Sequence, residues 1–242
     1  MTVAAGPKFL GTSPRAPGPA ATHDGARLAY RFVVGVDVEG FSGLSTLDQI
    51  RIQEDLGDAL NIAAVRTGLD RSTWYRQVAG DGELAFLPAD TDGLSLVAAY
   101  PLKMAEALRE VNDRRAPRPP VRVRLAMHHG TLVAGCFGPV GEAPIVVRRL
   151  LDSQILHDEL RVTEKDLALV VSESIFGGVV KTQLDGLEPS AFHPVEIQVQ
   201  NTTYIGYIHR DARDNGLGSL QWAPKWPLRW STLRNSLRPG RR

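Results

Sequence analysis

The sequence predicts an α+β fold of the ferredoxin-like type with a C-terminal extension, in which helices cover a sheet. Three observations support this fold class. A predicted strand, a helix and a strand hairpin follow one another, and the same kinds of elements then recur along the chain. The chain of 242 residues is 43% hydrophobic and 23% charged, which suits one buried core. It contains no run of about eighteen apolar residues, so we expect no transmembrane helix.

The first half of the fold begins with a strand over Tyr30–Asp37, an apolar run rich in β-branched residues. Apolar residues at helical spacing then predict a helix over 47–66. Two further strands are expected over 73–78 and 83–87, joined by a tight hairpin at Gly80-Asp81-Gly82.

The second half repeats these kinds of elements. We expect a helix over 91–111 and then a strand pair that turns at His128-His129-Gly130. A third helix should begin near Pro144 and run to about residue 160. The remaining predicted strands are 121–127 and 131–137 in the pair, followed by 167–171, 195–199 and 204–209.

Composition separates both ends of the chain from the middle. Residues 1–26 are rich in Pro, Gly and Ala without periodicity, so we expect them to be disordered, and we expect one domain over 27–210. Residues 211–242 form a basic tail that contains Trp222, Trp226 and Trp230. Residues 218–242 carry six basic and no acidic side chains. Because the net charge of the whole chain is +1, the first 217 residues have a net charge of −5. Because nucleic-acid binding needs a basic face, we expect no nucleic acid partner.

One cysteine, Cys136, excludes a disulfide framework and a multi-cysteine zinc site. It lies in a predicted apolar strand, where a small buried residue is expected. Without a signal-peptide pattern at the N-terminus, we expect a cytoplasmic protein.

Two acidic residues are the candidate chemical centre. Asp37 ends the first predicted strand and Asp81 lies in the hairpin turn, so both reach one edge of the sheet if the first two strands are neighbours. Paired carboxylates there suit Mg²⁺ or Mn²⁺, which prefer oxygen ligands. The loop 38–42 adds backbone amides at the start of a helix, a plausible phosphate cradle. Each aspartate taken alone is more often a turn residue that caps backbone amides, and the pair favours a metal site only when the rest of the chain is considered as well.

Four segments in order resemble the successive motifs of class III nucleotide cyclases. They are Val36–Ser42, Gly80–Glu83, Leu125–Gly135 and Gly141–Leu150. The resemblance covers roughly residues 28–155, and within that superfamily the chain is most similar to the pyrimidine cyclases of bacterial anti-phage (Pycsar) systems.

The resemblance implies an enzyme that converts UTP, or CTP, to the 3′,5′-cyclic monophosphate and pyrophosphate. It implies a homodimer with composite active sites, a second messenger for anti-phage defence and a separate effector protein. It also implies roles for single residues: Asp37, Asp81 and the Val38 carbonyl on two Mn²⁺ or Mg²⁺ ions, Gly40, Phe41 and Ser42 on the triphosphate, and Arg149 on the α-phosphate. Arg148 is expected to be the more solvent-facing of the two arginines, and the His-Gly hairpin to be structural.

Base recognition departs from the purine-cyclase pattern. The two positions that contact a purine are Gln77 and the neighbourhood of Gly138-Pro139 here. Because an amide both donates and accepts, Gln77 suits a pyrimidine edge. Ile145 replaces the ribose-binding asparagine, and the triphosphate lysine is missing near Gln200-Asn201-Thr202. A purine (adenylate or guanylate) cyclase and a non-catalytic nucleotide-binding regulator therefore stay open as alternatives.

Overall fold

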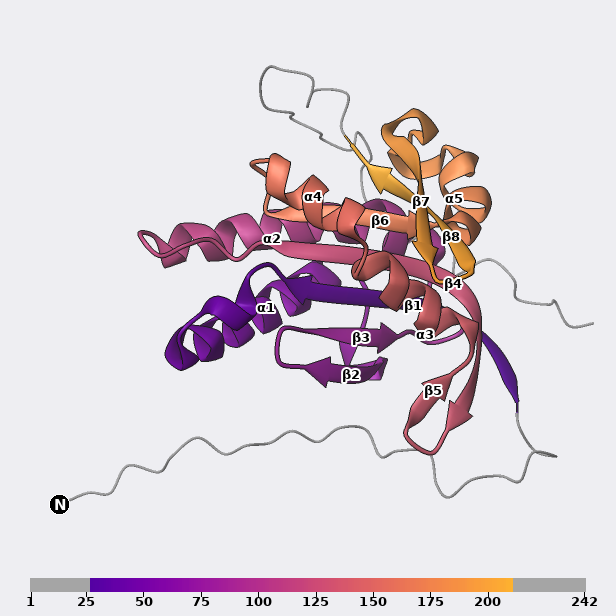
Figure 1. Ribbon diagram of the computed structural model, residues 1–242, viewed down its shortest axis with the longest axis horizontal. Helices are drawn as coiled ribbons and strands as arrows, with labels where there is room; N and C mark the ends of the chain where they lie inside the picture. The colour runs from indigo at the N-terminus through magenta and orange to yellow at the C-terminus, as the bar shows by residue number, and fades with distance from the viewer. Residues whose placement is uncertain (1–26, 211–242) are drawn as a thin grey trace, which may run out of the picture.

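A computed structural model describes residues 27–210 of the chain, shown in Figure 1. The predictions for residues 1–26 and 211–242, disorder and a basic Trp-containing tail, fall outside the described residues. Within residues 27–210, no helix is both long and apolar enough to cross a membrane.

One mixed sheet forms the centre of the described chain. Its order is β2-β3-β1-β4-β6-β8-β7, with the short β5 paired to β4, and all neighbours are antiparallel except β4 and β6. The first four strands of that order have the arrangement of a ferredoxin-like βαββαβ unit, which confirms the predicted α+β class. The strands are β1 (Leu28–Val38), β2 (Tyr75–Ala79), β3 (Gly82–Phe86), β4 (Val123–Gly135), β5 (Gly138–Val140), β6 (Leu167–Ser172), β7 (Phe192–Val199) and β8 (Thr202–His209).

Helices cover both faces of this sheet (Figure 1). Residues of α1, α2 and α5 share one hydrophobic core with one face, and residues of α3 and α4 share a second core with the other. The helices are α1 (Thr46–Arg66), α2 (Tyr100–Arg115, preceded by a π-helical turn over Ser95–Ala99), α3 (Glu142–Leu151), α4 (Gln154–Val162) and α5 (Glu173–Gly178).

The central strand β1 contributes to both cores because successive side chains of a strand point to opposite faces. Val34 and Val36 pack with α1 and α2, whereas Val33 packs with α3 and α4. By the same alternation Asp37 lies on the α3/α4 face, at the end of the strand.

The predicted turn at His128-His129-Gly130 is wrong. These residues lie inside the continuous strand β4, and each has a cross-strand partner on β1, Val33 opposite His128 among them. The chain turns later, at Cys136 and Phe137, where Gly135 pairs with Gly138. Gly138 has φ of 116°, a backbone conformation that glycine adopts without strain, so the turn forms here. Cys136 is therefore exposed rather than buried in a strand.

The single helix predicted over 144–160 is two helices. The hydroxyl of Ser153 accepts a hydrogen bond from the Leu156 amide and donates one to the Leu150 carbonyl over 2.7 Å. Serine at this position ends α3 and caps the start of α4, because its side chain competes with the helical backbone bonds. The apolar spacing continues across the break, which is why periodicity alone predicted one helix.

Candidate functional site

The two predicted acidic residues reach the same edge of the sheet. Asp37 lies opposite Gly82 in the β1–β3 ladder, and the Val38 amide donates a hydrogen bond to the Asp81 carbonyl over 2.8 Å. The condition given for this, that the first two strands are neighbours, is not met, because β3 lies between β1 and β2. Asp81 directly precedes β3, so the two aspartates come together all the same.

Gly82 allows this close approach of the hairpin to β1. A Cβ atom at residue 82 would lie 1.9 Å from the Val36 carbonyl oxygen and 2.8 Å from the Asp37 Cα. Both are backbone atoms of a central strand, so neither can move aside cheaply. Position 82 therefore requires glycine, and the close approach that it allows brings the hairpin of Asp81 against the backbone of Asp37.

Arg124 of β4 holds the Asp37 carboxylate. Its Nε donates to Oδ1 over 2.7 Å and its Nη2 to Oδ2 over 2.9 Å, and the two side chains are 9% and 14% exposed. Burial raises the pKa of Asp37 above its usual value, Arg124 opposes that rise, and the charge of Asp81 adds to it. Sequence reasoning missed Arg124, although an arginine within the apolar run of 121–127 was a visible signal.

His157 of α4 lies close enough to this ion pair to interact electrostatically with both of its members. Burial, and then the charge of Arg124, lower the pKa of His157, while the charges of Asp37 and Asp152 raise it. The imidazole is therefore a neutral neighbour of the pair at physiological pH. Because the spacing of α4 did not point to the sheet edge, sequence reasoning missed this residue as well.

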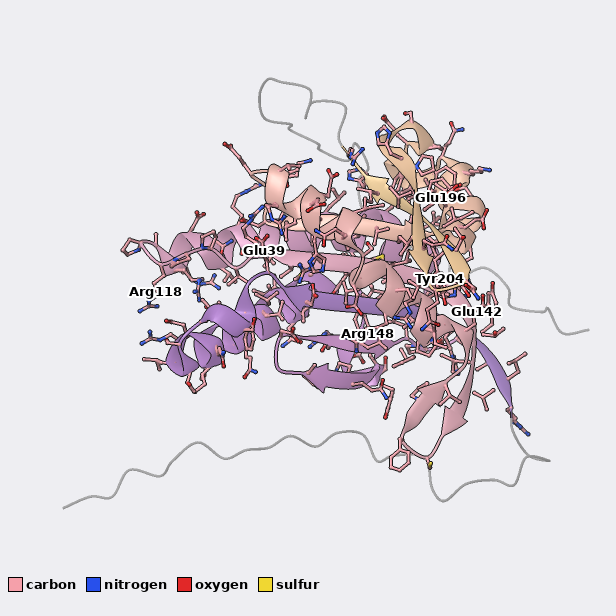
Figure 2. All side chains as sticks on the ribbon, viewed as in Figure 1. Glu39, Arg118, Glu142, Arg148, Glu196 and Tyr204 are labelled. Carbon is pink, nitrogen blue, oxygen red and sulfur yellow. The ribbon has the colours of Figure 1, made fainter. Side chains whose placement is uncertain are left out.

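Glu39 does not belong to the acidic pair. Its carboxylate accepts a hydrogen bond from Arg122 Nη1 over 2.9 Å, and the same guanidinium donates to carbonyls of Leu160 and Thr163 at the end of α4. Figure 2 shows Glu39 beside that end of α4. The arginine thus ties the loop after β1 to α4 and leaves Asp37 and Asp81 as the carboxylates at the edge.

The predicted phosphate cradle is a short 3-10 turn over Phe41–Gly43, followed by α1. Gln49 Nε2 donates to the Phe41 carbonyl over 3.3 Å, and Gln53 Nε2 donates to the Gly80 carbonyl over 2.8 Å. These bonds from α1 hold the turn and the hairpin of Asp81 against each other. Since the first amides of a helical turn have no acceptor within it, Phe41 and Ser42 lie where amides suit an anion.

The donor set fits a divalent metal ion of the magnesium or manganese type. Two carboxylates, Asp37 and Asp81, repel one another across the edge, and a hard cation relieves that repulsion. Within residues 27–210 no cluster of three His, Cys, Asp or Glu side chains could hold a metal, so other oxygen ligands (backbone carbonyl, water or nucleotide phosphate) would complete the shell around these two carboxylates. Arg124 at present occupies the oxygens of Asp37 that a cation would use.

Arg149 lies in the last turn of α3, with an exposed side chain. In the part of the chain that the structure describes, Arg149 forms no ion pair, and the guanidinium that pairs with Asp37 is that of Arg124. Arg148, labelled in Figure 2, is exposed too, so the expected difference in exposure between the two arginines is not seen.

The two predicted base-reading positions meet in the structure. Gln77 Nε2 donates to the Phe137 carbonyl over 3.2 Å, and a Cβ atom at Gly138 would lie 2.2 Å from that nitrogen and 3.0 Å from Tyr75 Oη. Tyr75 is a polar neighbour that sequence reasoning missed. A hollow of about 460 Å³ opens next to these residues, with Tyr75, Phe86 and Pro139 in its wall.

Comparisons with known proteins identify the fold. Neither a protein-family model nor a curated protein matches the chain. Among solved structures, the guanylyl cyclase Cya2 superposes with a TM-score of 0.54 at 16% identity, over 76% of this chain and 93% of that one. An adenylate/guanylate cyclase/hydrolase from Silicibacter pomeroyi gives 0.53 at 19% identity, over 77% of this chain and all (100%) of that one. The fold is therefore that of a class III nucleotide cyclase catalytic domain.

Proposed function

We propose that this protein is a nucleotide cyclase that converts a pyrimidine nucleoside triphosphate, UTP in preference to CTP, to the 3′,5′-cyclic monophosphate. The observation that carries the proposal is the convergence of Asp37 and Asp81 at one sheet edge, next to a turn with free amides, within a cyclase fold. The preference for UTP follows the resemblance to Pycsar cyclases and not a residue of the site.

The reaction is an intramolecular transfer at phosphorus. The ribose 3′-oxygen forms a bond to the α-phosphorus, the bond from that phosphorus to the β-phosphate oxygen breaks, and the hydroxyl proton passes to solvent. Two Mn²⁺ or Mg²⁺ ions, when bound, would lower the pKa of the attacking hydroxyl and neutralise charge on the departing pyrophosphate.

The chain's own residues bind and orient the reactants. Asp37, Asp81 and the Val38 carbonyl would hold the metal ions, and amides of Gly40, Phe41 and Ser42 would bind the triphosphate. Both aspartates lie on the hairpin-to-β1 contact that Gly82 permits, so their spacing is set before substrate binds. Preorganised charge of this kind lowers the barrier without reorganisation during the reaction.

The complete site requires two chains. Arg149 is exposed on α3, and the resemblance implies that a homodimer brings it to the site of the other protomer. Arg149 of the partner subunit then stabilises charge on the α-phosphate, for which a planar, always protonated guanidinium is suited. A two-fold dimer gives two such sites.

Two other readings have their own support. A purine cyclase is favoured by the names of the superposed structures, an adenylate/guanylate cyclase and a guanylyl cyclase. A non-catalytic nucleotide-binding regulator is favoured by Ile145, which is 50% exposed where the resemblance expects a ribose-binding asparagine.

In the main proposal, the cyclic product is a second messenger in the cytoplasm. It serves anti-phage defence and acts on a separate effector protein.

One assay separates the three readings. The full chain is incubated with ATP, GTP, CTP or UTP and Mn²⁺, and pyrophosphate and cyclic nucleotide are followed by chromatography and mass spectrometry. The proposal expects cyclic UMP, or cyclic CMP, as the main product, and none from an Asp81→Asn variant. Formation of cyclic AMP or cyclic GMP faster than of cyclic UMP or cyclic CMP would establish a purine cyclase. Binding of nucleotide without release of pyrophosphate would establish a non-catalytic regulator.

A further inference from the structure

The ion pair between Arg124 and Asp37 has a consequence for metal binding. We infer that Arg124 is an internal counterion that occupies the Asp37 carboxylate in the free protein, so that Mn²⁺ binds strongly only together with a nucleotide triphosphate. The part that concerns the nucleotide rests on the proposed function. The part that concerns Arg124 and Mn²⁺ rests on the described residues alone.

The sheet register builds this pair. Asp37 and Arg124 lie directly opposite one another in the β1–β4 ladder, and both side chains lie on the α3/α4 face. Both carboxylate oxygens accept hydrogen bonds from the guanidinium, over 2.7 and 2.9 Å. Bidentate charge-assisted bonds between side chains that are 9% and 14% exposed are strong and little screened by salt.

Arg124 has no second acceptor ready when Asp37 is taken from it. In the part of the chain that the structure describes, Asp37 is the only hydrogen-bond partner of its guanidinium. His157, which interacts electrostatically with both Asp37 and Arg124, is an imidazole and carries no negative charge that could replace the carboxylate. A guanidinium that is 9% exposed and unpaired is costly, so release of Asp37 to a metal ion alone is unfavourable.

An arriving nucleotide changes this balance. A triphosphate brings several negative charges to the edge at which Asp37 and Asp81 lie, and gives the released guanidinium of Arg124 a new anion. Metal and nucleotide then favour each other's binding, and by linkage the effect is reciprocal.

The competing view, in which Arg124 only orients Asp37 as a ligand, predicts the opposite change in Mn²⁺ affinity when Arg124 is replaced. If Arg124 competes for Asp37, removing its charge strengthens Mn²⁺ binding in the absence of nucleotide. If Arg124 only positions Asp37, removing it frees the carboxylate to rotate and weakens Mn²⁺ binding.

The test measures Mn²⁺ affinity of the full chain by electron paramagnetic resonance and calorimetry, without nucleotide. We expect Arg124→Gln to bind Mn²⁺ at least about tenfold more tightly than the natural chain, a typical size for coupling between sites. Arg124→Lys, which keeps the charge and serves if the glutamine variant does not fold, should bind more tightly by a smaller factor, because it cannot hold both oxygens. Arg118→Gln, a change at an exposed arginine labelled in Figure 2, should leave Mn²⁺ affinity unaltered.

Two further measurements complete the design. Adding a non-hydrolysable UTP analogue should tighten Mn²⁺ binding in the natural chain and much less in Arg124→Gln. Adding Asp37→Asn to Arg124→Gln should abolish the increase in Mn²⁺ affinity that Arg124→Gln alone produces. Mn²⁺ affinity that is unchanged or weaker in Arg124→Gln, or a gain that survives Asp37→Asn, would overturn the inference.

This experiment fails or succeeds separately from the cyclase assay. Tighter Mn²⁺ binding by Arg124→Gln would support the inference that Arg124 is a counterion of Asp37, even if the protein cyclises no nucleotide. The lack of cyclisation would then overturn the proposed function alone. If the natural chain forms cyclic product and Arg124→Gln has unchanged Mn²⁺ affinity, only the inference that Arg124 is a counterion is overturned.

Discussion

Gln77 on β2 and Phe137 at the β4–β5 turn, sixty residues apart, are joined by a hydrogen bond of 3.2 Å from the side-chain amide to the backbone carbonyl. Because a carbonyl only accepts, this bond determines which end of the amide faces the turn. The Oε1 atom and the second N–H of Gln77 take no part in this bond. If Gln77 contacts the base, as the resemblance implies, this bond links base recognition to the position of the β4–β5 turn.

Replacing Gln77 by Ala should reduce kcat/KM for the preferred pyrimidine nucleotide about tenfold, through a higher KM, because one or two hydrogen bonds to the base are lost. Steady-state kinetics with UTP and CTP measure this effect. Val78→Ala, at a neighbouring side chain that is 74% exposed and points to the other face, is the matched control. Equal kinetics of the Gln77 variant and the control would remove Gln77 from base recognition.

Asp81→Asn and Arg149→Ala should each abolish activity, and a mixture of the two inactive proteins should recover part of it. In a mixed dimer with composite sites, one site has both changes and the other has neither. Random exchange of subunits then restores about a quarter of the natural rate. The unique Cys136, which is exposed, accepts a fluorophore that reports subunit exchange.

The neighbouring Arg148→Ala is the control for Arg149→Ala, since both side chains are exposed on the same helix. It should keep its activity and need no complementation. A mixture of Asp81→Asn and Arg149→Ala that exchanges subunits and stays inactive would show that each site lies within one chain.

Gly82→Ala should destabilise the fold by about 3 kcal/mol or more, because the added methyl meets backbone of β1 that cannot yield. Urea unfolding followed by circular dichroism measures this free energy. Gly57→Ala in α1, where a Cβ meets nothing within 4 Å, should instead stabilise by about 0.5–1 kcal/mol. Similar stabilities of the two variants would contradict the close approach.

His128 should make the protein less stable in mild acid. Burial lowers the pKa of His128 from 6.5 to about 4. Between these two pH values the unfolded chain therefore binds a proton that the folded chain does not bind. Stability is therefore fully present above pH 6.5 and falls as the pH drops toward 4, by about 2 kcal/mol at pH 5.

Unfolding in urea at pH 7 and pH 5 measures that loss. His128→Gln should remove most of it, whereas His193→Gln, at an exposed histidine, should leave it in place. An equal loss in both variants would assign the acid sensitivity to other groups.

Much of the fold was predictable because its signals are local. The β-branched run of β1, the helical spacing of α1 and the Gly-Asp-Gly hairpin each depend on neighbouring residues, and the structure has each of them. Predictions were wrong where the signal was ambiguous. His128-His129-Gly130 looks like a turn, but its residues are paired with β1, and Ser153 interrupts a helix whose apolar spacing continues.

The sequence by itself determined that two aspartates stand at the ends of local strand and hairpin elements, because local spacing and turn chemistry specify those positions. Only the tertiary structure decided which groups meet them. Sheet register places Arg124 opposite Asp37, and the later turn of β4 places Phe137 beside Gln77. Register depends on packing between strands distant in sequence, and one step of register moves every side chain to the other face, so no local pattern could have given these contacts.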